Sequence, residues 1–215
     1  MGIYVFKRKV MMELLDNDLT DFGKHIIPNA ITTHRVFSYV YQGYWEDIGT
    51  IRSFFEANLD STSELPKFNF FDMESPIYTR ARFLPASKIN GAGIDHAVIS
   101  DGCIISWAQI SQSMIGIRSI INPGSRLHRV VLMGNDYFES QESIDENTKD
   151  GIPPIGIGSN CRIEEAIIDK NARIGNNVVI SPKDKPDHMD GDNFYVRDGI
   201  VVIPKNAIIK DDTVI

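Results

Sequence analysis

Isoleucine and valine recur at a step of five or six residues through the second half of the chain. The clearest run has steps of 6, 5, 6 and 6 residues and comprises Ile157, Ile163, Ile168, Ile174 and Ile180. Small, polar, Gly or Asn positions separate these residues. An α-helix repeats every 3.6 residues and a simple strand every 2, so neither explains a step near six. A β-helix does, because each short strand turns one apolar side chain inward at the same level of the coil.

Two further blocks keep this step. They comprise Val98, Ile104, Ile110, Ile115, Ile121 and Leu127, and then Val202, Ile208 and Val214 at the C-terminus. Ordinary short strands in a sandwich are the competing interpretation, but three blocks with one step favour a β-helix that begins near Ile89. Polar stretches interrupt it at 134–154 and 181–199. We expect these insertions to lie on a face or edge of the coil, where solenoids often carry function.

The first 60 residues show a different pattern. Residues 1–6 are apolar throughout, as in a central strand of a parallel sheet with both faces covered. Apolar residues at helical spacing predict a short helix within 7–16, and aromatic and β-branched residues predict a strand at 36–41. Thr50 is a candidate N-cap for a helix over 51–59. This order indicates the tail of an α/β domain. Since a central strand needs neighbours, we expect a fragment of a larger α/β protein.

The chain therefore divides into three predicted parts. Residues 1–65 form the C-terminal part of an α/β domain, and residues 91–215 form the β-helix. Between them, residues 66–90 form a connector in which three prolines disfavour helix.

Composition narrows the classes of partner. The net charge of −7 and the lack of a basic run argue against nucleic acid. No apolar stretch approaches the length of a membrane span, and no signal-peptide pattern opens the chain. Cys103 and Cys161 fall within the repeats without metal-ligand spacing, so we predict reduced, buried coil residues. A few placed Lys and Arg residues can still bind anions, which leaves phosphorylated substrates open.

The sharpest local candidate for chemistry is the segment 45–50. Asp47 follows the predicted strand at its C-terminal end, where open α/β sheets bind ligands. A short carboxylate suits Mg²⁺ held together with substrate phosphates, and Trp45 could stack on a sugar or base. The competing interpretation is a helix-capping turn with a buried Trp45. Asp21 begins another acidic turn, 21–23, for which helix capping is the better interpretation from the residues alone.

Seven short motifs also occur in a fixed order. They span 1–6, 21–23, 43–51, 54–59, 75–79, 156–158 and 166–175. The last, Ala-Ile-Ile-Asp-Lys-Asn-Ala-Arg-Ile-Gly, is highly specific. Together they closely resemble the C-terminal half of the ADP-glucose pyrophosphorylase (glucose-1-phosphate adenylyltransferase) family, over nearly the whole chain. The resemblance implies the α/β tail of a nucleotidyltransferase domain followed by a left-handed parallel β-helix of hexapeptide repeats.

The resemblance also implies a reaction and its binding residues. The family makes ADP-glucose and pyrophosphate from ATP and glucose 1-phosphate for glycogen or starch synthesis, with Mg²⁺ as the cofactor. The implied glucose 1-phosphate pocket comprises Tyr4, Asp21, Phe22, Trp45 and Asp47. Asp47 is also implied as one of two Mg²⁺ carboxylates.

A second implied site takes an anionic effector. Lys170 and Lys205 match lysines that bind such effectors, and Arg118 resembles a further anion contact. We expect the two lysines, although on different coils, to contribute to one anion site. The family is usually tetrameric, so the full-length enzyme is expected to form a homo- or hetero-tetramer. The implied location is the bacterial cytoplasm, with the plastid left open.

The departures from the family pattern leave alternatives open. The family's Gly-rich nucleotide loop, first Mg²⁺-binding Asp and sugar-phosphate Lys belong to the N-terminal half and are absent from this sequence. We therefore expect this chain to be inactive alone. A second interpretation is a non-catalytic β-helix subunit fragment that assembles with full-length subunits and modulates them. A third is a hexapeptide-repeat acyltransferase using His96 or His128, against which the motifs at 44–51 and 166–175 argue strongly.

Overall fold

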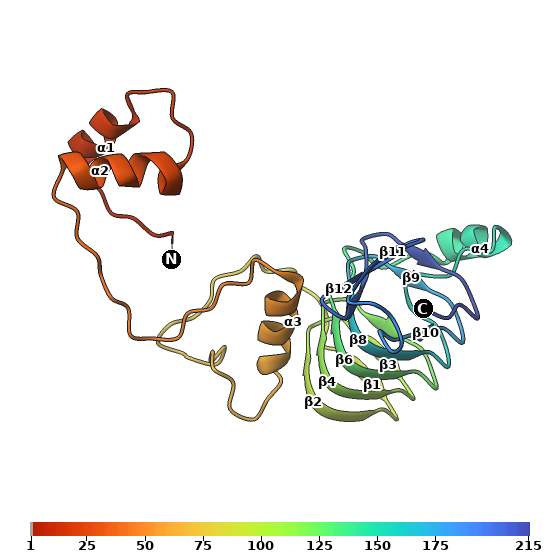
Figure 1. Ribbon diagram of the computed structural model, residues 1–215. Coiled ribbons are helices and arrows are strands. Elements are labelled where there is room, and N and C mark those ends of the chain that lie inside the picture. Colours follow the sequence, from red (N-terminus) through yellow and green to blue (C-terminus); the bar gives the residue numbers. More distant parts are fainter. Residues whose placement is uncertain (1) are drawn as a thin grey trace. The chain divides into compact units, whose positions relative to one another are not determined.

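The computed structural model describes residues 2–215, which divide into two compact units, one ending at Gly43 and the other comprising Tyr44–Ile215. The first unit contains α1 (Arg8–Leu15), a π-helical turn η1 (Phe22–Ile26) and α2 (Ile27–Thr33) (Figure 1). Its small core is formed by Leu14, Ile26 and Ala30, with three partly buried apolar side chains around them. The helix predicted within 7–16 is therefore confirmed as α1.

The two strands predicted in this region are not formed. Residues 2–6 and 36–41 adopt no strand, and side chains of the second segment are largely solvent-exposed, with Phe37 at 84% and Tyr39 at 88%. The prediction was wrong because a strand is stable only beside neighbours that take up its backbone hydrogen bonds. Within residues 2–215 neither segment has such a neighbour.

The second unit contains the predicted β-helix, in which parallel strands stack coil upon coil (Figure 1). The coil strands are β1 (Lys88–Asn90), β2 (Gly93–Ile99), β3 (Ile104–Ser106), β4 (Gln109–Ile115), β5 (Ile120–Ile121), β6 (Arg126–Leu132), β7 (Gly156–Ile157), β8 (Arg162–Ile168), β9 (Arg173–Ile174), β10 (Val179–Ile180), β13 (Ile200–Ile203) and β14 (Ile208–Ile209). One face is the sheet β1-β3-β5-β7-β9-β14. The long strands of the other sheet bend midway at residues with positive φ, namely His96, Gln112, Arg129 and Glu165. These bends divide that sheet into two further faces.

The inward positions confirm part of the predicted repeat and correct the rest. Every residue from Ile157 to Ile180 in the clearest run is at most 1% exposed, and Ile110, Ile115, Ile121 and Leu127 are also buried. The inward assignment was wrong for Val98, Ile104, Val202, Ile208 and Val214. The adjacent residues point inward instead: Ile99, Ile105, Ile203, Ile209 and Ile215. Each error lies in a pair of neighbouring apolar residues, where a shift of one position exchanges the two sides of a strand.

Two of the wrongly assigned valines belong to an apolar row on the outside of the coil. The row comprises Val98, Met114, Val131, Ile167 and Val202, which lie in register on successive strands. Helix α3 (Ile51–Asp60) covers this row from Met114 to Val202: Phe55 and Leu59 form one buried cluster with Val131, Ile167 and Ile200. This coil face is therefore apolar on both sides because a helix packs on its exterior. The sequence pattern alone did not distinguish apolar residues that face the coil interior from those that face α3.

The start of α3 follows the predicted capping. The Thr50 side chain accepts a hydrogen bond from the Ser53 backbone N–H at 3.1 Å, and the Ser53 hydroxyl accepts one from the Thr50 backbone N–H at 3.1 Å. This reciprocal pair satisfies two backbone donors that a helix start leaves free. It fixes where the helix begins and so which residues face the coil.

Both polar interruptions form structured insertions. The first contains α4 (Gln141–Lys149), and the second contains the antiparallel hairpin of β11 (His188–Gly191) and β12 (Phe194–Arg197). Cys103 and Cys161 are buried and unbridged, as predicted. Among residues 2–215, no helix has both the length and the apolarity to cross a membrane.

Candidate functional site

Lys170 and Lys205 meet on one carboxylate. Lys170 follows β8 and Lys205 follows β13, two strands that pair in parallel. Lys170 Nζ lies 2.9 Å from Asp136 Oδ1, and Lys205 Nζ lies 2.8 Å from Asp136 Oδ2. The two lysines named from the sequence thus converge, although they are 35 positions apart. Asp136, which the sequence did not single out, joins them from the 134–154 insertion.

Asn171 positions the Asp136 carboxylate. The Asp136 backbone N–H donates to Asn171 Oδ1 at 2.8 Å, and Asn171 Nδ2 donates to Asp136 Oδ2 at 3.1 Å. Asn171 is itself buried, at 6% exposure, and occupies a coil corner with positive φ. Hydrogen bonds from Lys205, Lys170 and Asn171 hold the pKa of Asp136 well below its usual range. In return, Asp136 raises the pKa of Lys205.

Arg118 lies beside this cluster and contacts the segment that carries Asp136. Its Nη1 donates to the Asn135 carbonyl at 3.2 Å, and its guanidinium lies 5.9 Å from the centre of the Phe138 ring. Asn135 Nδ2 donates back to the Arg118 carbonyl at 2.8 Å. Arg118 therefore holds the start of the insertion, and no hydrogen bond between it and the Asp136 carboxylate occurs among the described residues.

The lowered pKa of Asp136 predicts a specific dependence of stability on pH. A carboxyl whose pKa is lower in the folded state contributes stability fully above its unfolded pKa, about 4, and loses it as the pH falls through the folded value. The difference in free energy of unfolding between wild type and Asp136→Asn should be constant from pH 7 to about 5 and shrink below about 4. Urea denaturation at several pH values measures it. A difference that stays the same down to pH 3 would contradict the ion-pair assignment.

The residues proposed for glucose 1-phosphate fall in both units. In the first unit, the Tyr4 and Phe22 rings stack, with centroids 6.3 Å apart and planes at 19°, and Phe6 lies edge-on to Phe22 at 6.2 Å. Asp21 Oδ1 accepts a hydrogen bond from the Lys24 backbone N–H at 2.8 Å at the start of η1, so the capping interpretation is confirmed. The structure thus brings Tyr4 and Phe22 together.

Trp45 and Asp47 lie in the second unit, on the extended segment before α3. The Trp45 side chain is 51% exposed, so the alternative of a buried tryptophan is wrong. Within residues 2–215, no three His, Cys, Asp or Glu side chains converge as a metal site. Mg²⁺ in phosphate-transferring sites is held by one or two carboxylates plus substrate phosphates, and the role of the exposed Asp47 as one of them stays a prediction.

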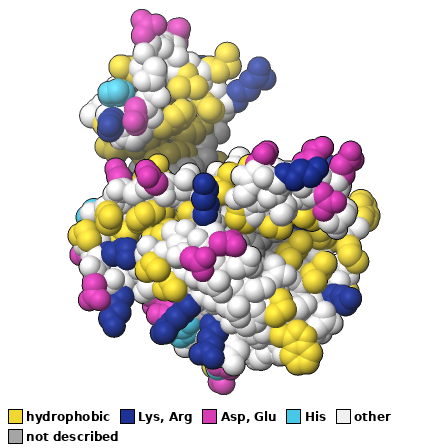
Figure 2. Space-filling view, turned by 90° about the vertical axis from the view of Figure 1, so that its right-hand side faces the viewer, with side chains coloured by type: hydrophobic (Ala, Val, Ile, Leu, Met, Phe, Trp, Pro, Cys, Tyr) yellow, Lys and Arg dark blue, Asp and Glu magenta, His cyan; other side chains and the backbone are white. Residues whose placement is uncertain are grey.

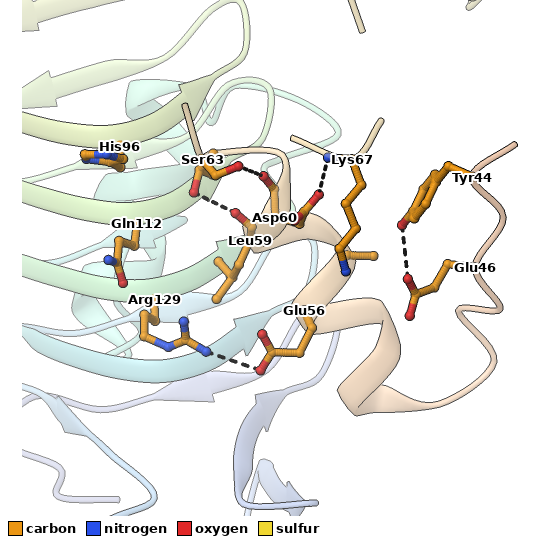
Figure 3. Close-up of a pocket in the computed structure, with 12 residues that line it drawn as sticks. Tyr44, Glu46, Glu56, Leu59, Asp60, Ser63, Lys67, His96, Gln112 and Arg129 are labelled. Carbon is orange, nitrogen blue, oxygen red and sulfur yellow. Dashed lines mark hydrogen bonds and ion pairs between the residues drawn. The ribbon is translucent and has the colours of Figure 1, made fainter. Parts of the chain in front are cut away.

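A cleft between α3 and a coil corner was not predicted (Figure 3). It encloses about 310 Å³ and is lined by Tyr44 and Glu46, the sequence neighbours of Trp45 and Asp47. Across from them lies Arg129, which pairs with Glu56 of α3 at 3.2 Å and with Glu165 at 2.5 Å. The lining mixes both charges, and this arginine is already bound to carboxylates. The cleft therefore lies between the coil and the segment that carries Asp47. Its lining contains acidic and basic side chains together and is not predominantly positive.

Charge over the rest of the visible coil surface is also mixed. On the face shown in Figure 2, Lys and Arg side chains are interspersed with Asp and Glu side chains and with exposed hydrophobic ones. Attraction of an anion to this face must therefore come from local groupings of cations rather than from a broad basic field. The lysine pair is such a grouping.

In sequence order, a short helical unit precedes a parallel coil that carries an external helix, and this coil defines a β-helix protein. Comparison with protein families supports both parts: residues 1–64 match the nucleotidyl transferase family, and residues 82–214 match the GLGC left-handed parallel beta-helix domain. The second match covers more than half of the chain, and the chain belongs to this GLGC family of sugar nucleotidyltransferases. The family assignment agrees with the resemblance drawn from the seven motifs, and it replaces the acyltransferase interpretation.

Proposed function

We propose that the chain functions in glucose-1-phosphate adenylyltransferase, which forms ADP-glucose and pyrophosphate from ATP and glucose 1-phosphate for glycogen or starch synthesis. The observation that supports this most is the joint match to a nucleotidyl transferase segment and a GLGC β-helix along one chain. In the proposed reaction a phosphate oxygen of glucose 1-phosphate attacks the α-phosphorus of ATP. The bond to the β-phosphate breaks, and pyrophosphate leaves without a covalent enzyme intermediate.

Each candidate residue has a role in this proposal. The residues proposed to bind glucose 1-phosphate are Tyr4, Asp21 and Phe22 in the first unit and Trp45 and Asp47 in the second. Asp47 holds part of the Mg²⁺ coordination, and the ion would offset the negative charge that develops on the phosphates. The catalytic form is proposed to be a tetramer.

The coil is proposed to carry the regulation. Lys170 and Lys205 bind an anionic effector, because two ammonium groups fixed on adjacent coils are already arranged to bridge one oxyanion. Arg118 supports the same site through the segment 135–138.

A second candidate function is a non-catalytic subunit that modulates complete subunits. It is favoured by one contrast between the two sites. The two lysines converge on one carboxylate within residues 2–215, whereas no group of three metal-ligating side chains converges among the described residues.

An exchange assay with radiolabelled glucose 1-phosphate, ATP and Mg²⁺ tests the proposal. We expect no ADP-glucose from the chain alone, and ADP-glucose once the N-terminal nucleotidyltransferase half of a family member is supplied with it. Asp47→Ala should then reduce formation by at least about 100-fold, the scale on which loss of charge stabilisation lowers rates. The matched control is Asp72→Ala, an exposed connector aspartate whose carboxylate only accepts a local backbone N–H.

The outcomes separate the two candidates. An Asp47→Ala variant that supports full activity would reject the catalytic role of this chain. If Lys170→Ala at the same time alters the response of complete subunits to anions, the modulating subunit is supported instead. ADP-glucose formation by the chain alone would contradict the expectation that the ATP site lies elsewhere.

A further inference from the structure

A second groove lies on the coil face that β4, β6 and β8 form before their midway bends. It encloses about 230 Å³. Ile110, Leu127 and Ile163 are buried on these strands, so the residues on either side of each point outward. The outward side chains that line the groove form two rows in register, one of Gln109, Arg126 and Arg162 and the other of Ser111, His128 and Glu164.

This groove is separate from the lysine pair. Arg162 is the first residue of β8, whereas Lys170 lies beyond the end of that strand. Between them, β8 bends at Glu165, where φ is positive. None of the residues that line the groove belongs to the cluster around Asp136.

The groove places two arginines next to each other. Arg126 and Arg162 are register partners, and neighbouring strands lie about 4.8 Å apart, so their positive charges are close enough to repel. Arg162 Nε donates to Glu164 Oε1 at 2.8 Å. Among residues 2–215, the exposed Arg126 guanidinium makes no hydrogen bond or ion pair, so no carboxylate of the described chain neutralises it.

The groups around the arginines are either neutral or already partnered. Ser111 Oγ and His128 Nδ1 lie 2.9 Å apart. Asp95 on β2 is the register partner of Ser111, and its carboxylate lies 2.8 Å from His96 Nδ1. The lining contains two arginines and one glutamate, which leaves one positive charge in excess while His128 is neutral.

The arrangement of donors indicates which anion fits. A guanidinium presents its N–H groups as a flat fork that matches the oxygens of a phosphate group. Two forks on successive strands can hold different pairs of oxygens of one tetrahedral anion. A carboxylate has only two oxygens, in one plane, and a single charge. Gln109 and Ser111 line the same groove and can donate to the remaining oxygens.

We propose that this groove binds a phosphate- or sulfate-type dianion, with Arg126 as the first contact and Arg162 as the second. Glu164 competes with the ligand for Arg162 and so lowers the affinity. The anion removes the repulsion between the two arginines, which gives binding a source of free energy besides its own contacts. This site is independent of the proposed function and of the lysine pair.

NMR titration of the intact 215-residue chain tests the site directly. Inorganic phosphate is added near pH 7.5, where it is mostly a dianion, and the arginine Nε–H signals are followed. The signals of Arg126 and Arg162 should shift along one saturation curve. Arg118 reports the lysine pair separately, and the exposed Arg8 of α1 is the reference that should not shift. Sulfate should saturate the same signals, whereas acetate at equal ionic strength should not.

Three changes with different expected directions sharpen the test. Arg126→Gln should weaken the binding seen at Arg162 by about tenfold or more, since it removes a charge-assisted contact. Glu164→Gln should tighten binding severalfold, a gain that a misfolded variant does not show. The double variant Lys170→Ala, Lys205→Ala should leave the curve unchanged. Arg8→Gln is the matched control, because it removes the same charge from an exposed helix position.

Several results would overturn the proposal. It is wrong if Arg126 shifts no more than Arg8, if acetate saturates the Arg126 signal as phosphate does, or if Arg126→Gln and Arg8→Gln weaken binding equally. It is also wrong if Glu164→Gln does not tighten binding, or if the double lysine variant abolishes the shift at Arg126. None of these results depends on ADP-glucose formation, which is measured separately.

Discussion

Phe55→Ala is expected to destabilise the docking of α3 on the coil by about 3–5 kcal/mol. Phe55 is fully buried and lies in one cluster with Leu59 of the same helix and with Val131, Ile167 and Ile200 of the coil exterior. Its ring also lies under the Arg129 guanidinium, 5.6 Å from the centroid. Truncation removes the largest contact of the helix and leaves a cavity that the rigid coil cannot fill.

Hydrogen exchange of the α3 amides measures this effect. Protection should fall by a factor of 100 or more in Phe55→Ala, at about 1.4 kcal/mol for each tenfold change. The coil has its own interior cluster, so its urea midpoint should change much less. Phe71→Ala is the control, because Phe71 is 86% exposed and should leave α3 protection unchanged. Equal protection in Phe55→Ala and wild type would show that α3 does not depend on this contact.

The docking of α3 explains where the sequence pattern succeeded and where it failed. A step of five or six residues predicted the coil because every turn of a β-helix must bury one apolar side chain. It could not choose between Val98 and Ile99, or between Val202 and Ile203, since both members of each pair are apolar. The structure separates them: Ile203 points into the coil, and Val202 lies on the outside next to α3. Local pattern does not encode which exterior face another element will cover.

The predicted strands at 1–6 and 36–41 failed for a related reason. Their composition favours strands, but a strand forms through pairing, and no described residue pairs with 2–6 or 36–41. Helices α1 and α3 were predictable because their hydrogen bonds are local and their apolar residues recur at helical spacing. In this region, the helical pattern therefore predicted the structure correctly, and the strand pattern did not.

In the candidate sites too, the sequence did not predict which residues far apart along the chain come into contact. Resemblance named Lys170 and Lys205, and stacking of consecutive coils brings them together because residues one coil apart lie in register. Asp136 could not be singled out, because it is one of several acidic residues in a polar insertion. Its role depends on how that insertion folds back against the corner residue Asn171.

How the insertion is fixed leads to the second large effect. Glu139→Ala is expected to destabilise the protein by about 3 kcal/mol or more, the range seen when one partner of a buried ion pair is removed. The Glu139 carboxylate accepts hydrogen bonds from Arg173 Nη2 at 2.5 Å, the Ile155 backbone N–H at 2.8 Å and Asn147 Nδ2 at 2.9 Å. Burial opposes ionisation of this group, but these donors outweigh it and hold the pKa of Glu139 below its usual value.

Removing the carboxylate leaves the Arg173 guanidinium, only 14% exposed, without its anion. Most of the predicted loss should therefore come from the arginine that remains rather than from the contact removed. The double variant Glu139→Leu, Arg173→Met should recover a large part of the stability, which Glu139→Leu alone should not. Glu142→Ala, at the exposed start of α4, is the control. Thermal unfolding measures stability, and limited proteolysis within 141–149 reports whether the insertion has detached. Because the folded pKa of Glu139 is lowered, the contribution of its carboxylate to stability should be complete above about pH 4.5 and decline in acid.

The double variant also decides which partner of Glu139 matters. If it is no more stable than Glu139→Leu, the carboxylate acts mainly through Ile155 and Asn147, and Arg173 is a minor partner.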